Sequence, residues 1–101
     1  MTIAEVSVVP LGTKTASVSQ YVARAVKVLE HEKGIEYEIT PMGTIIEGDL
    51  DKILAVVKKM HEGTFGEGVA RVVTAVKIDD RRDKVQGMME KVDSLKRKLE
   101  A

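Results

Sequence analysis

The sequence has no cysteine, few aromatic residues and no excess of either charge. Without cysteine the chain cannot form disulfides, thiolate zinc sites or iron–sulfur clusters, and it has no cysteine nucleophile. Aromatic residues make up only 3% of the chain, too few for the stacking platforms used in single-stranded nucleic-acid binding. Basic and acidic residues number 16 each, so no net field attracts nucleic acid. We therefore expect no nucleic-acid partner.

Long apolar runs are missing as well. No stretch of about 18 apolar residues occurs, so the sequence predicts no membrane-spanning helix. The N-terminus has no basic segment followed by an apolar one, and residues 3–9 already have the pattern of a strand, so no signal peptide is predicted. The absence of cysteine also suits a reducing compartment. These features predict a cytoplasmic protein with no membrane partner.

Apolar residues account for 44% of the 101 residues, which is enough for a folded core. This length suits one domain, and we expect residues 1–101 to form it. Because aromatic residues are scarce, the core must be built from Val, Ile, Leu, Ala and Met. A domain of this size buries a limited share of its surface, so a partner interface would add to its stability.

Periodicity predicts the order of the secondary structure. Alternating residues over 2–9 and 35–40 predict two strands. Strands are also expected over 44–47, after a short hairpin, and over 69–78. Helical spacing predicts helices over about 18–33, from Asp49 onward, and over about 82–99. In the second helix we expect Asp49 to be the N-cap, and the predicted buried stripe is Leu50, Ile53, Leu54, Val57 and Met60. The order β-α-β-β-α-β-α predicts an α+β protein, a ferredoxin-like sandwich with an additional C-terminal helix.

The sheet should have apolar side chains on both faces. On strand 69–78, Val72, Val76 and Ile78 alternate with Val69, Val73 and Ala75, yet two helices cover only one face. We therefore predict a homo-oligomer, either a homodimer or a homotetramer. If a second subunit covers the other face, several polar residues lie in or near the interface: Glu5, Ser7, Arg71, Thr74 and Lys77.

The last helix has a narrow apolar seam. Its apolar positions follow a spacing of three and four residues, as in a coiled coil. They are Val85, Met88 or Met89, Val92, Leu95 and Leu99. The pattern is compatible with packing on the helix's own sheet and with packing on a neighbouring subunit, and both remain open.

Catalytic and metal-binding motifs are incomplete. His31 and His61 do not extend to a His-Glu-x-x-His pattern, and both fit structural positions at helix ends. The segment 12–15 lacks the glycine that a phosphate-binding loop requires, and no serine lies in a Gly-x-Ser-x-Gly turn. The carboxylates of Glu5, Glu47 and Asp79 are spaced in no pattern that brings an acid and a base together. We expect no enzyme activity, no metal and no cofactor.

Polar residues gather where two strands and a helix meet. Pro41 and Gly43 break the chain between the strands 35–40 and 44–47, and Thr40, Thr44 and Glu47 lie beside this turn, which makes it a candidate pocket. Ser17 and Ser19 precede a helix, where they are suited to helix capping or to presenting N–H groups to a polar ligand.

Several motifs together resemble one family. In chain order they are Val9-Pro10-Leu11-Gly12-Thr13, Ala16-Ser17-Val18-Ser19, Gly43-Thr44, Ile46-Glu47-Gly48, Met60-His61-Glu62, Val69 to Thr74, and Arg81 with Asp83-Lys84. This set closely resembles the small thiamine-binding protein family over essentially the whole chain. The Gly-Thr-x-x-Glu-Gly element is its most specific part.

The resemblance implies a non-catalytic binder of thiamine or of its hydroxymethylpyrimidine moiety. It also implies a tetramer of two sheet-paired dimers, with ligand held near the subunit interfaces. The ligand-binding residues that it implies are Ser17, Ser19, Thr44, Glu47, Arg71 and Thr74. In this hypothesis Glu47 accepts from the amino group or pairs with the ring charge, while hydroxyls complete the hydrogen bonds. The alternative function is a regulatory or structural protein-interaction module without a small-molecule ligand.

Overall fold

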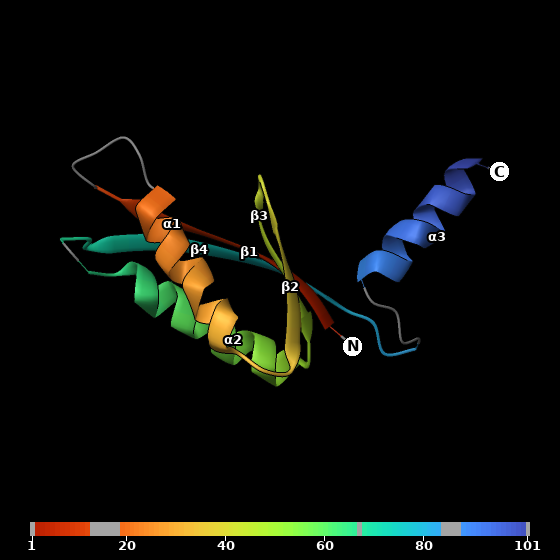
Figure 1. Cartoon of the computed structure of the whole chain (residues 1–101), viewed down its shortest axis with the longest axis horizontal. Coiled ribbons are helices and arrows are strands. Elements are labelled where there is room, and N and C mark those ends of the chain that lie inside the picture. The colour runs from red at the N-terminus through yellow and green to blue at the C-terminus, as the bar shows by residue number, and fades with distance from the viewer. Residues whose placement is uncertain (1, 13–18, 67, 84–87, 101) are drawn as a thin grey trace.

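Four strands form one antiparallel sheet in the order β2-β3-β1-β4 (Figure 1). The computed structural model describes residues 2–12, 19–66, 68–83 and 88–100. The strands are β1 Thr2–Leu11, β2 Ile35–Thr40, β3 Gly43–Gly48 and β4 Arg71–Asp80. This strand order, with a helix in each crossover, is the ferredoxin-like sandwich that the periodicity predicts.

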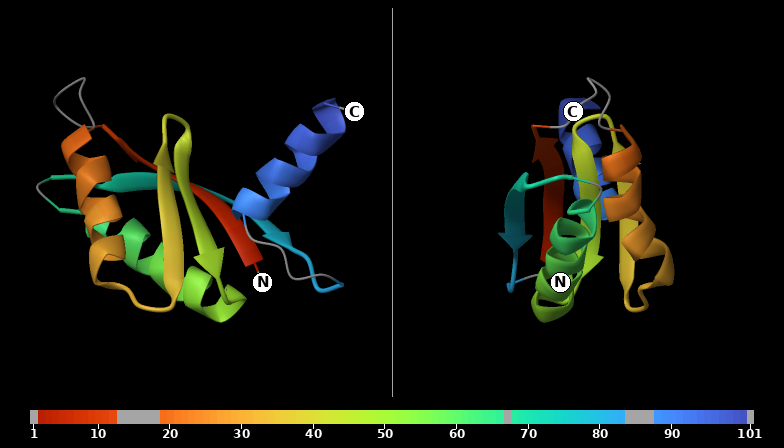
Figure 2. Two further views of the ribbon diagram at one scale, coloured as in Figure 1. Left: turned by 45° about the vertical axis from the view of Figure 1, so that its right-hand side comes forward. Right: turned by 90° about the vertical axis from the view of Figure 1, so that its left-hand side faces the viewer.

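Two helices, α1 Ser19–Lys27 and α2 Leu50–Thr64, cover one face of the sheet (Figure 2). We call this the helix-covered face. Every second side chain of β1 points toward the two helices, because side chains of a strand alternate between faces. The main core cluster consists of Ala4, Val6, Val8, Ala25, Leu29, Ile46, Ile53, Val56, Val57 and Met60. Tyr21 is buried as well.

The opposite side of the sheet, which we call the open face, carries the other alternate residues. By strand register these are Ile3, Glu5, Ser7, Val9 and Leu11 of β1, Glu36 and Glu38 of β2, Ile45 and Glu47 of β3, and Arg71, Val73, Ala75, Lys77 and Asp79 of β4. Val72, Val76 and Ile78 share the helix-covered face, as predicted. Thr74 lies with them, so the expectation that it joins Arg71 and Lys77 on the outer face is wrong.

The first helix is shorter than predicted. Regular α-helix ends at Lys27, and residues Val28–His31 tighten into a 3₁₀ turn, η1. The buried Leu29 lies in this turn, so the chain keeps its apolar contact while the helix narrows. The predicted start at residue 18 lies outside the described residues.

Helix α2 differs from its prediction in two details. Asp49 stands at the N-cap position with extended backbone, but its side chain makes no capping hydrogen bond. Leu54 is 46% exposed, whereas Val56 is fully buried. The buried stripe is therefore Ile53, Val56, Val57, Met60 and Thr64, because α2 must face α1 and the sheet together.

The end of the chain differs more. Strand β4 begins at Arg71 instead of Val69, and Val69 pairs with Gly66 in an isolated bridge. The last helix, α3, spans Met88–Glu100, so its predicted start near Arg82 is wrong. Arg82 instead forms an ion pair with Asp80, two residues earlier at the end of β4.

Helix α3 extends away from the sheet (Figure 1). The radius of gyration is 15.3 Å, larger than the value of about 13 Å typical of compact domains of this length. Lys91 forms an ion pair with Asp79 at the end of β4. Within the described chain, the apolar residues of α3 do not cover its own sheet.

Candidate functional site

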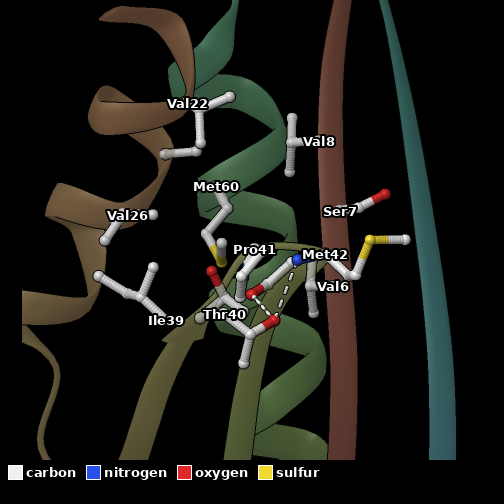
Figure 3. Close-up of a pocket in the computed structure, with 13 residues that line it drawn as sticks. Val6, Ser7, Val8, Val22, Val26, Ile39, Thr40, Pro41, Met42 and Met60 are labelled. Atoms are coloured by element: carbon white, nitrogen blue, oxygen red, sulfur yellow. Dashed lines mark hydrogen bonds between the residues drawn. The ribbon is translucent and has the colours of Figure 1, made fainter. Parts of the chain in front are cut away.

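A pocket lies on the helix-covered side, between α1, β1 and the hairpin that joins β2 to β3 (Figure 3). Its volume is about 200 Å³. The lining consists of Val6, Ser7, Val8, Val22, Ala25, Val26, Ile39, Thr40, Pro41, Met42, Gly43, Thr44 and Met60. None of these side chains is charged, so the pocket suits an uncharged, largely apolar group.

The hairpin at the pocket mouth is held by its own hydrogen bonds. The Thr40 hydroxyl donates to the Gly43 carbonyl oxygen at 2.8 Å and accepts from the Met42 N–H at 3.2 Å (Figure 3). Gly43 has a φ of 152°, and a Cβ built there would lie 2.8 Å from the Val6 carbonyl oxygen. A glycine is therefore required where the hairpin meets β1, and Thr40 is committed to the turn.

Thr44 supplies a hydroxyl to the pocket wall. It lies on β3 opposite Val6 and Ile39, and only 4% of its surface is exposed. Among the described residues the Thr44 hydroxyl has no hydrogen-bond partner. No side-chain nitrogen or oxygen of the described residues is both fully buried and unpaired, so this hydroxyl keeps some exposure. The hydroxyl is thus open to a ligand, as donor and as acceptor.

Glu47 lies on the opposite side of the sheet from Thr44. The two residues are three positions apart on one strand, so their side chains point to different faces. Glu47 lines a separate shallow depression with Gly34, Ile35, Glu36 and Gly48. Within one protomer, a small molecule in the pocket cannot reach it.

Arg71 also lies outside the pocket lining, and it is far from Glu47. It pairs with Leu11 at one end of β1, whereas Glu47 pairs with Ile3 near the other end. Eight residues of strand separate the two positions along β1, or about 26 Å at roughly 3.3 Å per residue. Both side chains are on the open face, but they cannot hold the same ring.

Thr74 belongs to a small cluster that the sequence did not reveal. Its hydroxyl is 2.7 Å from Nδ1 of His61 in the last turn of α2. The His61 ring makes an edge-to-face contact with Phe65, with 5.3 Å between ring centroids. Thr74 and Thr44 flank β1 opposite Val8 and Val6, which separates them by about 12 Å. No sequence motif joins His61 to a residue thirteen positions later.

The two predicted serines, Ser17 and Ser19, lie close in sequence to the start of α1. Ser17 lies outside the described residues. Ser19 is the first residue of α1, which contributes Val22, Ala25 and Val26 to the pocket wall. Of the six predicted site residues, Thr44 alone is a described residue of the pocket lining.

The strongest electrostatic interaction lies away from the pocket. Glu32, after η1, accepts hydrogen bonds from Nζ of Lys52 at 2.8 Å and of Lys59 at 2.6 Å. These hydrogen bonds lower the pKa of Glu32 from its ordinary value of 4.5 to about 2. The Arg82 guanidinium likewise lowers the pKa of Asp80. The ion pairs of Glu32 join the end of η1 to α2, whereas the Asp80–Arg82 pair is local, and none of these residues lines the pocket beside the β2–β3 hairpin.

Comparison with known proteins assigns the family. The model of the family described as thiamine-binding protein matches residues 4–96. The chain belongs to the thiamine-binding protein family. The UPF0045 protein YqgV of Bacillus subtilis is similar to it, with 46% identity over 103 residues and coverage of 99% of each chain.

Solved structures of similar proteins have the same fold. The hypothetical protein MJ1052 of Methanocaldococcus jannaschii matches with a TM-score of 0.85 and 42% identity, over 94% of this chain and 95% of that one. A candidate thiamine biosynthesis/salvage protein of Thermotoga maritima matches with a TM-score of 0.76 over 93% and 97% of the two chains. Its 23% identity supports a shared fold only. The resemblance inferred from the motifs and the predicted fold class are thus both confirmed.

Two kinds of feature are absent from the described part of the chain. Among the described residues, no cluster of three or more His, Asp or Glu side chains is arranged to hold a metal ion. No helix in the described ranges has both the length and the apolar character needed to span a bilayer.

Proposed function

We propose that this thiamine-binding family member binds thiamine through its hydroxymethylpyrimidine moiety, in the pocket between α1 and the β2–β3 hairpin, without catalysing a reaction. The observation that carries the proposal is a neutral, mostly apolar cavity whose lining includes the hydroxyl of Thr44. Residues 1–101 act as one binding domain in this proposal, and the cysteine-free composition suits a cytoplasmic location.

The size of the pocket favours one ring. Sites that enclose drug-sized ligands have volumes of about 300–1,000 Å³. A cavity of about 200 Å³ is smaller, and it matches a single substituted pyrimidine better than the whole of thiamine. The thiazolium ring would therefore remain at the mouth.

The charge of the pocket leads to the same assignment. A thiazolium cation buried among uncharged side chains would lack a counter-ion, which is costly. The aminopyrimidine ring is neutral, and its amino group and ring nitrogens match a hydroxyl that both donates and accepts. Thr44 is thus proposed as the residue that orients the ring, with Ser17 and Ser19 on the segment that leads into α1.

Self-association completes the proposal. Apolar residues around the mouth are exposed, with Ile39 at 62% and Met42 at 79%. A second subunit that covers them would close the mouth around the ligand. Glu47, Arg71 and Thr74, which do not line this pocket, would contact ligand only where subunits meet.

Strand β4 offers one route to self-association, because it is an edge strand of ten residues. Antiparallel pairing of two copies about Ala75 would place Arg71 of each copy opposite Asp79 of the other. The result would be a sheet-paired dimer, and two such dimers would form a homotetramer. Since the chain has no cysteine, an Ala75→Cys variant should form a disulfide-linked dimer if this register is right.

Titration calorimetry with thiamine and with hydroxymethylpyrimidine tests the ligand assignment. Thr44→Val should weaken binding of both by about fivefold, the equivalent of one lost hydrogen bond of about 1 kcal/mol. Glu30→Gln, an exposed carboxylate outside the pocket lining, is the matched control and should keep the affinity. If Glu47→Gln abolishes binding and Thr44→Val does not, the ligand lies on the open face and the pocket assignment is wrong.

A second function is favoured by one observation, the exposed apolar residues of α3. They suit a regulatory or structural module that binds another protein. Purification with one stoichiometric protein partner, together with no heat on titration with either pyrimidine compound, would favour this function.

A further inference from the structure

Helix α3 carries an apolar stripe that its own fold leaves uncovered. Met89, Val92, Leu95 and Leu99 recur every three or four residues and so share one side of the helix. Their exposed fractions are 59%, 44%, 58% and 76%. A monomer rarely exposes such a continuous apolar surface without a partner.

The helix's own sheet is not that partner. Lys91 pairs with Asp79 on the open face, at the far end of β4. From this point α3 runs outward, away from the strands (Figures 1 and 2). The ion pair joins α3 to the open face at the end of β4, and the exposed fractions show that its own sheet does not cover the stripe.

A second copy of α3 is a poor partner as well. Lys91, Lys96 and Lys98 occupy the positions that flank the stripe in a heptad pattern. Whether two such helices paired parallel or antiparallel, lysines would face lysines across the seam. Like charges at these positions disfavour the pairing.

The open face has the complementary character. Val9, Leu11 and Val73 form an apolar patch there, with exposed fractions of 42%, 37% and 47%. Carboxylates lie farther along this face, about 13 Å or more from Val9, on β1 and toward the β2 edge: Glu5, Glu36, Glu38 and Glu47. The basic side chains of this face, Arg71 and Lys77, are both on β4. An apolar patch at one end of the face and carboxylates toward the β2 edge thus match a helix that carries an apolar stripe and, near its C-terminus, Lys96 and Lys98.

We propose that α3 of one copy lies across the open face of a second copy, with its stripe on the apolar patch and Lys96 and Lys98 toward the carboxylates of β2. A thirteen-residue helix is about 20 Å long, enough to cross several strands spaced about 4.8 Å apart. Two-fold symmetry makes the exchange reciprocal. The proposal rests on the self-association included in the proposed function.

Crosslinking tests the contact directly. Two single-cysteine variants, Val9→Cys and Leu95→Cys, are mixed in forms of different mass, because the parent chain offers no other thiol. A short bis-maleimide should link Val9→Cys protein to Leu95→Cys protein. Links of Leu95→Cys only to itself would show helix–helix pairing and overturn the proposal. Absence of all links in an oligomeric sample would do the same.

Native mass spectrometry supplies matched controls. Leu95→Ser should shift the protein toward smaller species, whereas Arg97→Ser, on the other side of α3, should not. Lys98→Glu and Glu38→Lys should each weaken assembly by about fivefold, and their combination should restore it. Unchanged assembly in Leu95→Ser would overturn the proposal. A wild-type monomer would refute self-association itself, whereas ligand binding is judged separately by calorimetry.

Discussion

Replacement of Gly43 by alanine should destabilise the protein more than replacement of any exposed glycine that meets no neighbour. Two costs add at this position. The φ of 152° is unfavourable for an L-residue, which costs about 1–2 kcal/mol. The new Cβ would also lie 2.8 Å from the Val6 carbonyl oxygen, a backbone atom of the central strand β1. Relieving such a contact costs about 1–3 kcal/mol.

The neighbour cannot simply move away. Val6 pairs with Thr44 across β1 and β3, so a shift of its carbonyl would disturb the sheet and the pocket wall together. We expect Gly43→Ala to lower the free energy of unfolding by about 2–5 kcal/mol in total. Each kcal/mol corresponds to a fall in Tm of about 4–8 °C for a domain of this size.

Gly34→Ala is the control for this prediction. Gly34 has a φ of 82°, but nothing lies within 4 Å of the point that a Cβ would occupy there, so only the backbone cost of about 1–2 kcal/mol remains. Urea unfolding of both variants separates the steric cost from the conformational one. Equal losses would show that the hairpin relaxes around the new methyl group and that the close approach to Val6 does not matter.

Three further predictions concern the core, the His61 cluster and the ion pairs. Ile53→Ala should lower the free energy of unfolding by about 2–5 kcal/mol, because Ile53 is fully buried. Leu54→Ala, at the exposed neighbouring position, should lower it by less than about 1 kcal/mol. A larger loss for Leu54→Ala in urea unfolding would favour the buried stripe expected from sequence. Thr74→Val should lower stability by about 1 kcal/mol through loss of the contact with His61, and Thr74→Ser, which keeps the hydroxyl, should be closer to wild type in the same measurement. Glu32 has a folded pKa below its ordinary value, so its contribution is complete above pH 4.5 and is lost as the pH falls toward about 2. In thermal melts across that range Glu32→Gln should show a flatter fall in Tm than wild type, while Glu30→Gln keeps the wild-type slope; equal slopes for all three would contradict the role of Glu32.

Local patterns were sufficient for most of the fold. Strand β2 spans Ile35–Thr40 as the alternation predicts, and the hairpin with Pro41 and Gly43 follows it directly. These features depend on residues close together in sequence. The stripe of α2 does not, since two overlapping sets of apolar positions have helical spacing. Contact with α1 selects Val56 over Leu54, and no local pattern contains that information.

The start of α3 was mispredicted for a similar reason. Helical spacing extends back to Val85, and acidic residues such as Asp79 and Asp80 are favourable before a helix N-terminus. In the structure Asp79 and Asp80 are the last residues of β4, and Asp80 is paired with Arg82. The long antiparallel pairing of β1 with β4, down to Thr2 opposite Asp80, keeps these residues extended. A pairing partner almost eighty residues away decides the boundary.

The predicted site residues on β3 and β4 fall on two different faces of the sheet. Thr44 and Glu47 were grouped because they are near in sequence, but an odd spacing on a strand places them on opposite faces. The same rule separates Arg71 from Thr74 on β4. The odd spacing of these residues along their strands therefore shows that the predicted site residues are divided between the two faces of the sheet. The helix-covered surface with Thr44 has the cavity, and the open surface with Glu47 and Arg71 has the charge and the uncovered apolar patch. The cavity and the uncovered apolar patch therefore lie on the two sides of the same sheet.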